Sequence, residues 1–141
     1  MIFLKSPSEI TKMRAANQIV AELLLALEPM IRPGANTQEL DDFATRFITE
    51  RGGRPAFKGY RVPGLNPFPA AICASVNDGI VHGIPSPKVI LKEGDIIGID
   101  VGVELDGYYG DGARTYAVGT ISTDASHLMD VTREALAIGI A

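Results

Sequence analysis

An Asp106-Gly107 pair between two long strand-like segments is the feature that most constrains how this 141-residue chain can fold. Asp-Gly is favoured in two-residue hairpin loops because both of its positions tolerate the left-handed backbone that such loops need. The segments 96–105 and 108–118 therefore predict an antiparallel hairpin. In the first segment every odd position is large and apolar, so that face is expected to pack into a core: Ile97, Ile99, Val101, Val103 and Leu105.

The opposite face of the predicted hairpin carries carboxylates. Asp100 lies between Gly98 and Gly102, and glycine is tolerated in a strand where another group approaches the backbone closely. A two-residue loop places Gly102 opposite Asp111 and Asp100 opposite Ala113, so both aspartates share a face, with Cα atoms about 7–8 Å apart. Two carboxylates this close repel each other unless a cation lies between them. The spacing therefore suggests a site for divalent metal ions.

Two alternatives stay open on this spacing alone. An aspartate in a strand is often simply solvated, and a bulge at Gly110 or Gly112 would break the assumed register. His82, taken by itself among apolar residues, is more typical of a packed core or edge residue than of a catalyst. The paired aspartates are thus a hypothesis that depends on the register.

Three segments carry helix signals. Ser-Pro-Ser-Glu at 6–9 forms a capping box with proline at the first helical position, and predicts a helix that ends by Pro29. A second helix is expected from 36 or 37 to the glycine pair at 52–53, and a third from 122–124 onward. Apolar residues at helical spacing predict one buried stripe on each: Ile10, Met13, Ala16, Val20, Leu23, Leu24 and Leu27; Leu40, Phe43, Ala44, Phe47 and Ile48; Ala125, Leu128, Val131, Ala135 and Ile138.

The middle of the chain changes character. Residues 54–69 interleave proline and glycine with aromatic residues, which favours a binding loop or, alternatively, a surface wrap. A buried strand is expected at 70–76, a turn at 77–79 and a short strand carrying His82 at 80–84. Together these elements predict one α+β domain, residues 1–141, with helices packed on one face of an antiparallel sheet.

Composition narrows the function classes. The formal charge is −4, so the chain lacks the basic surface that nucleic-acid binding or attraction to an anionic membrane requires. Its longest apolar stretch, 20–27, contains Glu22 and is too short for a membrane span. Cys73 is the only cysteine, which excludes an internal disulfide. A cytoplasmic protein without nucleic-acid or membrane partners is the expectation.

Three strings stand in a specific order: ICASVNDGIVHGIP at 72–85, GDIIGIDVGV at 94–103 and DGYYGDGARTYAVG at 106–119. Their order and spacing resemble the bacterial type I methionine aminopeptidases, and KSPSEITKMRAAN and IRPGANTQELD resemble that family's first helices. The resemblance implies a pita-bread fold of which this chain is the N-terminal half. It implies removal of the initiator methionine from nascent proteins when the second residue is small.

The resemblance also implies roles for individual residues. Asp100 matches a bidentate metal ligand and Asp111 a bridging one, in a centre of two divalent ions (manganese, iron, cobalt or zinc) whose bridging hydroxide is the nucleophile. His82 matches a catalytic histidine that contacts the scissile amide. Cys73 and Phe68, with Tyr60, fall where the family lines its methionine pocket; for Cys73 a small buried hydrophobe is an equal alternative.

The family's centre also uses a histidine and two glutamates from the C-terminal half of the fold, which is absent from this sequence. We assign no substitutes among the last helical segment's Asp124, His127, Asp130 and Glu134. The chain is therefore expected to be a fragment, inactive alone, with an apolar seam open to its missing half or to self-association. Its expected partners are N-terminal methionines of nascent chains and the ribosome. The alternative is a non-catalytic module that binds nascent chains or ribosomes.

Overall fold

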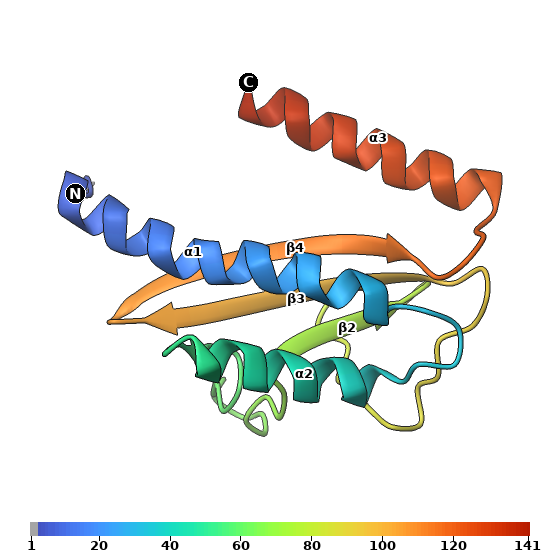
Figure 1. The fold of residues 1–141 in the computed structure, drawn as a ribbon, viewed down its shortest axis with the longest axis horizontal. Helices are drawn as coiled ribbons and strands as arrows, with labels where there is room; N and C mark the ends of the chain where they lie inside the picture. Colours follow the sequence, from blue (N-terminus) through green and yellow to red (C-terminus); the bar gives the residue numbers. More distant parts are fainter. Residues whose placement is uncertain (1–2) are drawn as a thin grey trace.

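A computed structural model describes residues 3–141 of the chain. Its elements follow the order α1 (Pro7–Leu27), a short 3-10 helix (Glu28–Met30), α2 (Thr37–Glu50), β1 (Arg54–Pro55), β2 (Ile72–Val76), β3 (Ile96–Leu105), β4 (Tyr108–Ala117) and α3 (Thr123–Ile140) (Figure 1). The antiparallel sheet has β3 at its centre. β4 pairs along one edge of β3, and β1 and β2 pair along the other.

The β3–β4 hairpin forms in the predicted register. Pairing runs without interruption from Ile96 opposite Ala117 to Leu105 opposite Tyr108, so the alternative of a bulge is wrong. Asp106 and Gly107 both have positive φ angles, 51° and 80°, as a two-residue turn of this type requires. The second strand ends one residue earlier than predicted.

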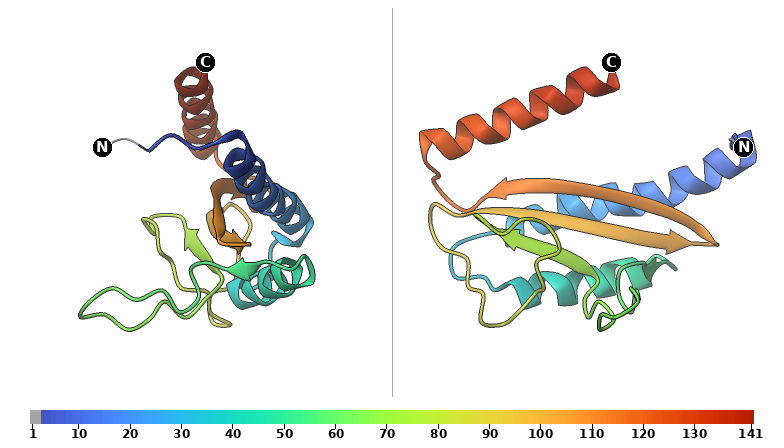
Figure 2. Two further views of the ribbon diagram at one scale, coloured as in Figure 1. Left: turned by 90° about the vertical axis from the view of Figure 1, so that its left-hand side faces the viewer. Right: turned by 180° about the vertical axis from the view of Figure 1, so that it is seen from behind.

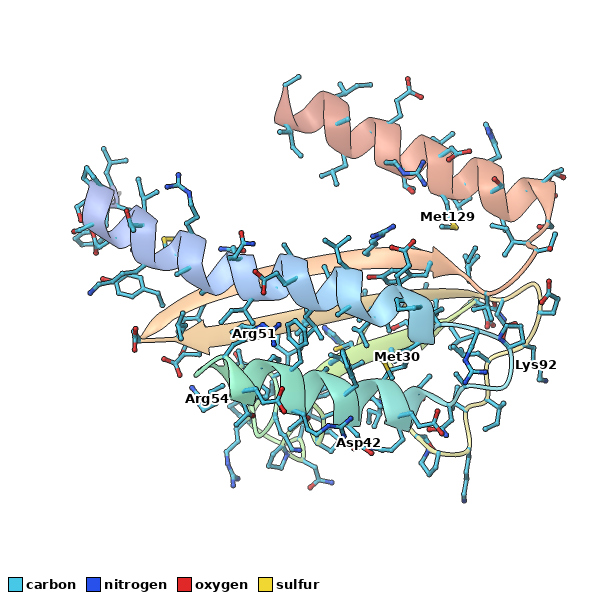
Figure 3. All side chains as sticks on the ribbon, viewed as in Figure 1. Met30, Asp42, Arg51, Arg54, Lys92 and Met129 are labelled. Atoms are coloured by element: carbon cyan, nitrogen blue, oxygen red, sulfur yellow. The ribbon has the colours of Figure 1, made fainter. Side chains whose placement is uncertain are left out.

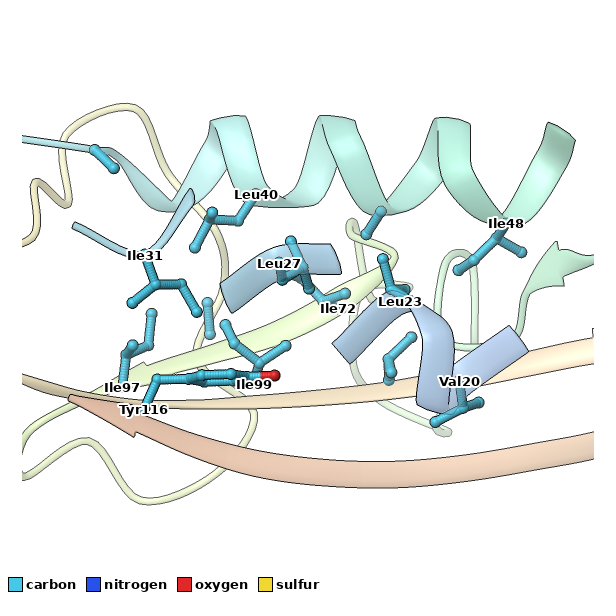
Figure 4. Close-up of a cluster of buried hydrophobic side chains, with 14 of the residues drawn as sticks. Val20, Leu23, Leu27, Ile31, Leu40, Ile48, Ile72, Ile97, Ile99 and Tyr116 are labelled. Carbon is cyan, nitrogen blue, oxygen red and sulfur yellow. The ribbon is translucent and has the colours of Figure 1, made fainter. Parts of the chain in front are cut away.

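Helices α1 and α2 cover one face of the sheet, while the loop 56–69 extends from the other side (Figure 2). The odd positions of β3 point at these helices and form the centre of the core, as predicted, although Leu105 at the hairpin end is only partly buried. Figure 4 shows the cluster they join, in which side chains from both helices meet those of the sheet: Val20, Leu23, Leu27, Ile31, Leu40, Ile48, Ile72, Ile97, Ile99 and Tyr116.

Helix α1 begins with the predicted capping box, since the Ser6 side chain accepts from the Glu9 N–H and the Glu9 carboxylate accepts from the Ser6 N–H. Its predicted stripe is wrong at the start, because Ile10 is exposed, and incomplete further on, because Ile19 is buried. The reason is geometric. The backbone of Ala16 already lies against Gly110, near the hairpin end, so the preceding turns extend past the sheet.

Helix α2 is capped by Asn36, whose side chain accepts from the Glu39 N–H, and it ends before Gly52 as predicted. Its apolar stripe is buried or partly buried against the core. The same face also buries Asp41, which the hydrophobic pattern did not indicate.

Two predictions for the middle of the chain are wrong. Residues 80–84 are a loop, because Val81 and His82 have φ angles of 45° and 53°, which extended backbone does not permit. The loop nevertheless follows β2, and the Gly83 carbonyl accepts from the Ala74 N–H at 2.8 Å. Within the segment predicted to be irregular, Arg54 and Pro55 form the short strand β1. The buried strand predicted at 70–76 forms as β2, but it starts two residues later, at Ile72, and only its first three residues are fully buried.

Helix α3 starts where predicted, with Ser122 as its cap, but its apolar stripe is not buried. It leaves the sheet after β4 and stands apart from α1 and α2 (Figure 1). Every residue of α3 is exposed or only partly covered, including Leu136, which is 64% exposed. No helix in residues 3–141 is both long enough and apolar enough to cross a membrane.

Candidate functional site

Asp100 and Asp111 lie on the face of the hairpin that points away from the helices. A side chain at Gly112, the next residue along β4, would meet Val20 of α1, so Asp111 must point to the opposite side. The register pairs Asp111 with Gly102, and Asp100 with Ala113 on one side and Cys73 on the other. The two aspartates are therefore diagonal neighbours, as the loop arithmetic predicted.

Burial raises the pKa of Asp100, and the negative charge of Asp111 raises it further, while His82 acts in the opposite direction. Burial and the charge of Asp111 thus both disfavour ionisation of the Asp100 carboxyl. A divalent cation would remove the repulsion, and carboxylate oxygens suit hard or borderline cations. The pair therefore fits part of a metal centre. Within residues 3–141, no group of three or more histidine, cysteine, aspartate or glutamate residues could complete it.

The glycines beside Asp100 have different surroundings. A Cβ at Gly102 would lie 2.6 Å from a ring carbon of Phe57, so this aromatic side chain already occupies the space there. At Gly98 the nearest atoms would be 3.8 and 3.9 Å away, in Ser75 and Thr115, so that side is open. The predicted space around the carboxylate thus exists on the Gly98 side.

An apolar pocket of about 480 Å³ adjoins Asp100. It brings together the four residues that the sequence suggested for a substrate pocket, Tyr60, Phe68, Cys73 and His82. Its remaining walls are residues that the sequence analysis did not assign: Phe57, Val62, Leu65, Asn66 and Ile84. Asp111 does not line this pocket. Phe57, Val62 and Leu65 could have been identified from the density of aromatic and apolar residues in the loop 54–69.

Cys73 lines the inner end of the pocket and is 4% exposed. Burial, together with the charge of Asp100, raises the pKa of its thiol to about 11, despite a hydrogen bond from the His82 backbone N–H. The thiol therefore stays protonated near neutral pH and serves as a soft, apolar wall.

Phe68 and Tyr60 are held together by backbone hydrogen bonds. The Gly59 N–H donates to the Phe68 carbonyl at 2.8 Å, and the Phe68 N–H donates to the Tyr60 carbonyl at 2.9 Å. Phe68 is half-buried, whereas Tyr60 is 65% exposed at the rim. A wider groove of about 760 Å³ continues from Asp100 and His82 toward α3.

Residues 11–141 match the sequence profile described as metallopeptidase family M24. The chain belongs to this family. It is 49% identical over 140 residues to methionine aminopeptidase B of Synechocystis, spanning 99% of this chain and 51% of that protein. It is 50% identical over 140 residues to methionine aminopeptidase 1 of Bacillus subtilis, spanning 99% of this chain and 54% of the relative.

The crystal structure of methionine aminopeptidase from Rickettsia prowazekii superposes with a TM-score of 0.89 at 40% identity, over 96% of this chain and 52% of the other. This similarity confirms the α+β pita-bread fold class. This M24 chain thus spans about half the length of the curated relatives it matches.

Proposed function

We propose that this chain is the N-terminal part of a methionine aminopeptidase catalytic domain, which removes the initiator methionine when the second residue is small. One observation carries the proposal: Asp100 and Asp111 share a face, and Asp100 borders an apolar pocket lined by Phe68, Cys73 and His82. An ion-binding carboxylate pair next to a pocket for an unbranched apolar side chain is the arrangement that such a reaction needs.

Each of these residues has a distinct role in the proposal. Asp100 and Asp111 hold a centre of two divalent ions, which when bound lowers the pKa of water and polarises the scissile carbonyl. Phe68, Cys73 and Tyr60 surround the methionine side chain, since a soft thiol and aromatic rings suit a thioether. His82, at the border of the pocket and the groove, donates to the scissile amide.

The substrate class follows from this site. N-terminal methionine is presented by nascent polypeptides, which places the proposed activity in the cytoplasm and near the ribosome. The two aspartates provide part of a ligand set, so we expect turnover only when residues outside this chain, from a longer polypeptide or a second molecule, complete the centre. The metal identity is proposed only as manganese, iron, cobalt or zinc.

A chimera tests the activity. Residues 1–141 replace the matching half of the Bacillus subtilis relative, which is 50% identical to this chain. We expect the chimera to release methionine from a Met-Gly peptide with Mn²⁺ or Co²⁺, and much faster than from a Met-Leu peptide. Asp100→Asn should abolish release, whereas Asp106→Asn, in the exposed turn, should not.

Metal binding is tested on the 141-residue chain itself. Co²⁺ absorption should show binding that is lost in Asp100→Asn and in Asp111→Asn but kept in Asp106→Asn. A chimera that folds and binds Co²⁺ yet releases no methionine would refute the proposed activity. Binding of Met-Gly peptides by such a chimera would instead favour a non-catalytic nascent-chain module.

A further inference from the structure

Asp41 is a buried acid that the proposed mechanism does not use. It lies on α2 with 3% of its surface exposed. One of its carboxylate oxygens, Oδ1, accepts from two consecutive backbone N–H groups, those of Ala71 at 2.7 Å and Ile72 at 3.1 Å. A single side-chain atom thus joins α2 to the start of β2.

Ala71 directly precedes β2, and the Ile72 N–H points to the outer edge of that strand. β2 pairs with β3 along one edge, where Cys73 lies opposite Asp100. On the outer edge the Ala74 N–H donates to Gly83, and the Ile72 N–H, two residues earlier, donates to Asp41. Buried backbone donors need acceptors. For Ile72 the carboxylate therefore takes the place of a neighbouring strand at the start of β2.

The anchored residues connect the two walls of the apolar pocket. Phe68 lies three residues before Ala71, and Cys73 directly follows Ile72. Displacing this junction would move both walls relative to Asp100. Both hydrogen bonds need an oxygen acceptor at this position of α2, which is itself fixed by the core.

Burial of the carboxylate has a cost, since it raises the pKa of Asp41, and the hydrogen bonds from Ile72 and Ala71, with a smaller contribution from the charge of Lys58, offset this only in part. The two hydrogen bonds thus recover part of the cost of burying the acid.

We propose that Asp41 is a positioning residue, which holds Phe68 and Cys73 in place through the Ala71 and Ile72 N–H groups and so sets the shape of the pocket. That the pocket takes a methionine side chain rests on the function proposed above. The anchoring itself does not depend on that function.

The only cysteine of the chain makes the anchoring measurable, because Cys73 lies one residue after the anchored pair. The rate at which the thiol reagent DTNB modifies Cys73 reports local opening of β2, and its dependence on urea separates local opening from global unfolding. In the 141-residue chain we expect Cys73 of the Asp41→Ala variant to react at least about tenfold faster than Cys73 of the parent at zero urea, because both hydrogen bonds at the start of β2 are lost.

Asp41→Asn is the informative conservative variant. Its amide oxygen can accept both N–H groups as Oδ1 does, so Cys73 reactivity should stay within about twofold of the parent. Asp42→Ala is the matched control, because Asp42 lies on the side of α2 away from the sheet (Figure 3) and its carboxylate accepts from the Gln38 side chain. It should leave Cys73 reactivity unchanged.

The same variants in the chimera test the consequence for the pocket. Asp41→Ala should raise the KM for a Met-Gly peptide about tenfold with little change in kcat, and Asp41→Asn should restore the KM. Should Asp41→Ala not fold, Asp41→Asn still decides: faster Cys73 modification in a folded Asn variant would overturn the proposal.

Equal Cys73 reactivity in parent and Asp41→Ala would also overturn it, as would a loss of global stability without a change in local opening. An inactive parent chimera would count against the proposed function alone, because the thiol measurement needs no turnover.

Discussion

At the residue scale, Tyr116 shows how one polar atom ties two elements together. This β4 residue is buried, and its hydroxyl donates to the Leu24 carbonyl of α1 at 2.7 Å. Burial raises the pKa of the phenol to about 12, against a smaller opposing effect of the Arg114 charge. The hydrogen bond needs the protonated phenol, so packing and protonation are linked at this position.

Tyr116 is therefore expected to titrate late, as the pH approaches about 12. The folded pKa lies above the ordinary value of 10.0, so the neutral phenol contributes stability that is fully present below pH 10 and is lost as the pH rises through about 12. Phenolate absorbance at 295 nm measures the titration. Tyr116→Phe should remove the late step and lower the free energy of unfolding by about 1 kcal/mol. Tyr109→Phe, at an exposed site, should do neither.

At the element scale, the loop carrying His82 depends on its close approach to β2. The Gly83 N–H donates to the Ser75 hydroxyl at 3.2 Å, and the Gly83 carbonyl accepts from Ala74. A Cβ at Gly83 would lie 2.3 Å from the Ala74 carbonyl oxygen. Since that atom belongs to a strand held by β3, it cannot move aside without disturbing the pairing.

Gly83→Ala should thus push the loop away from β2 and lower the free energy of unfolding by about 1–3 kcal/mol. Urea unfolding measures this loss, and hydrogen exchange of the Ala74 amide locates it. The matched control is Gly139→Ala on α3, where a Cβ would meet nothing within 4 Å. If both variants had the same stability, the contact at Gly83 would not constrain the loop.

At the scale of the whole molecule, α3 is packed differently from the other helices. Arg133 and Asp130 of α3 pair with each other at 3.0 Å, while its large apolar residues Leu128, Leu136 and Ile138 remain exposed. The core is built from α1, α2 and the sheet. An amphipathic helix gains most of its stability from burying its apolar face, and α3 obtains little from this chain.

A chain ending at residue 121 should for that reason have a free energy of unfolding within about 0.5 kcal/mol of that of the 141-residue chain, because α3 contributes no buried residue. It should also bind less of the dye ANS, since exposed apolar side chains are lost. Replacing Leu128, Leu136 and Ile138 with glutamine in the longer chain should lower dye binding equally. A clear drop in the urea midpoint of the shorter chain would show instead that α3 stabilises the sheet.

Local patterns in the sequence were sufficient for the hairpin and for the starts of all three long helices. Asp106-Gly107 specified the turn, strict alternation specified the buried face, and together they placed Asp100 and Asp111 on one side. Ser6, Asn36 and Ser122 cap helices because the signal and its effect lie within three residues. Such features are predictable since the interacting groups are neighbours along the chain.

Other features depended on the tertiary structure. The Phe57 ring over Gly102 and the burial of Asp41 each arise where segments far apart in sequence meet, and the loop at 80–84 takes its shape from its contact with β2. Asp41 and Ala71 are 30 positions apart. The spacing of apolar residues and the capping signals describe interactions between residues that are close together in the sequence. They carry no information on which distant backbone will need an acceptor, and only the packed fold decided that.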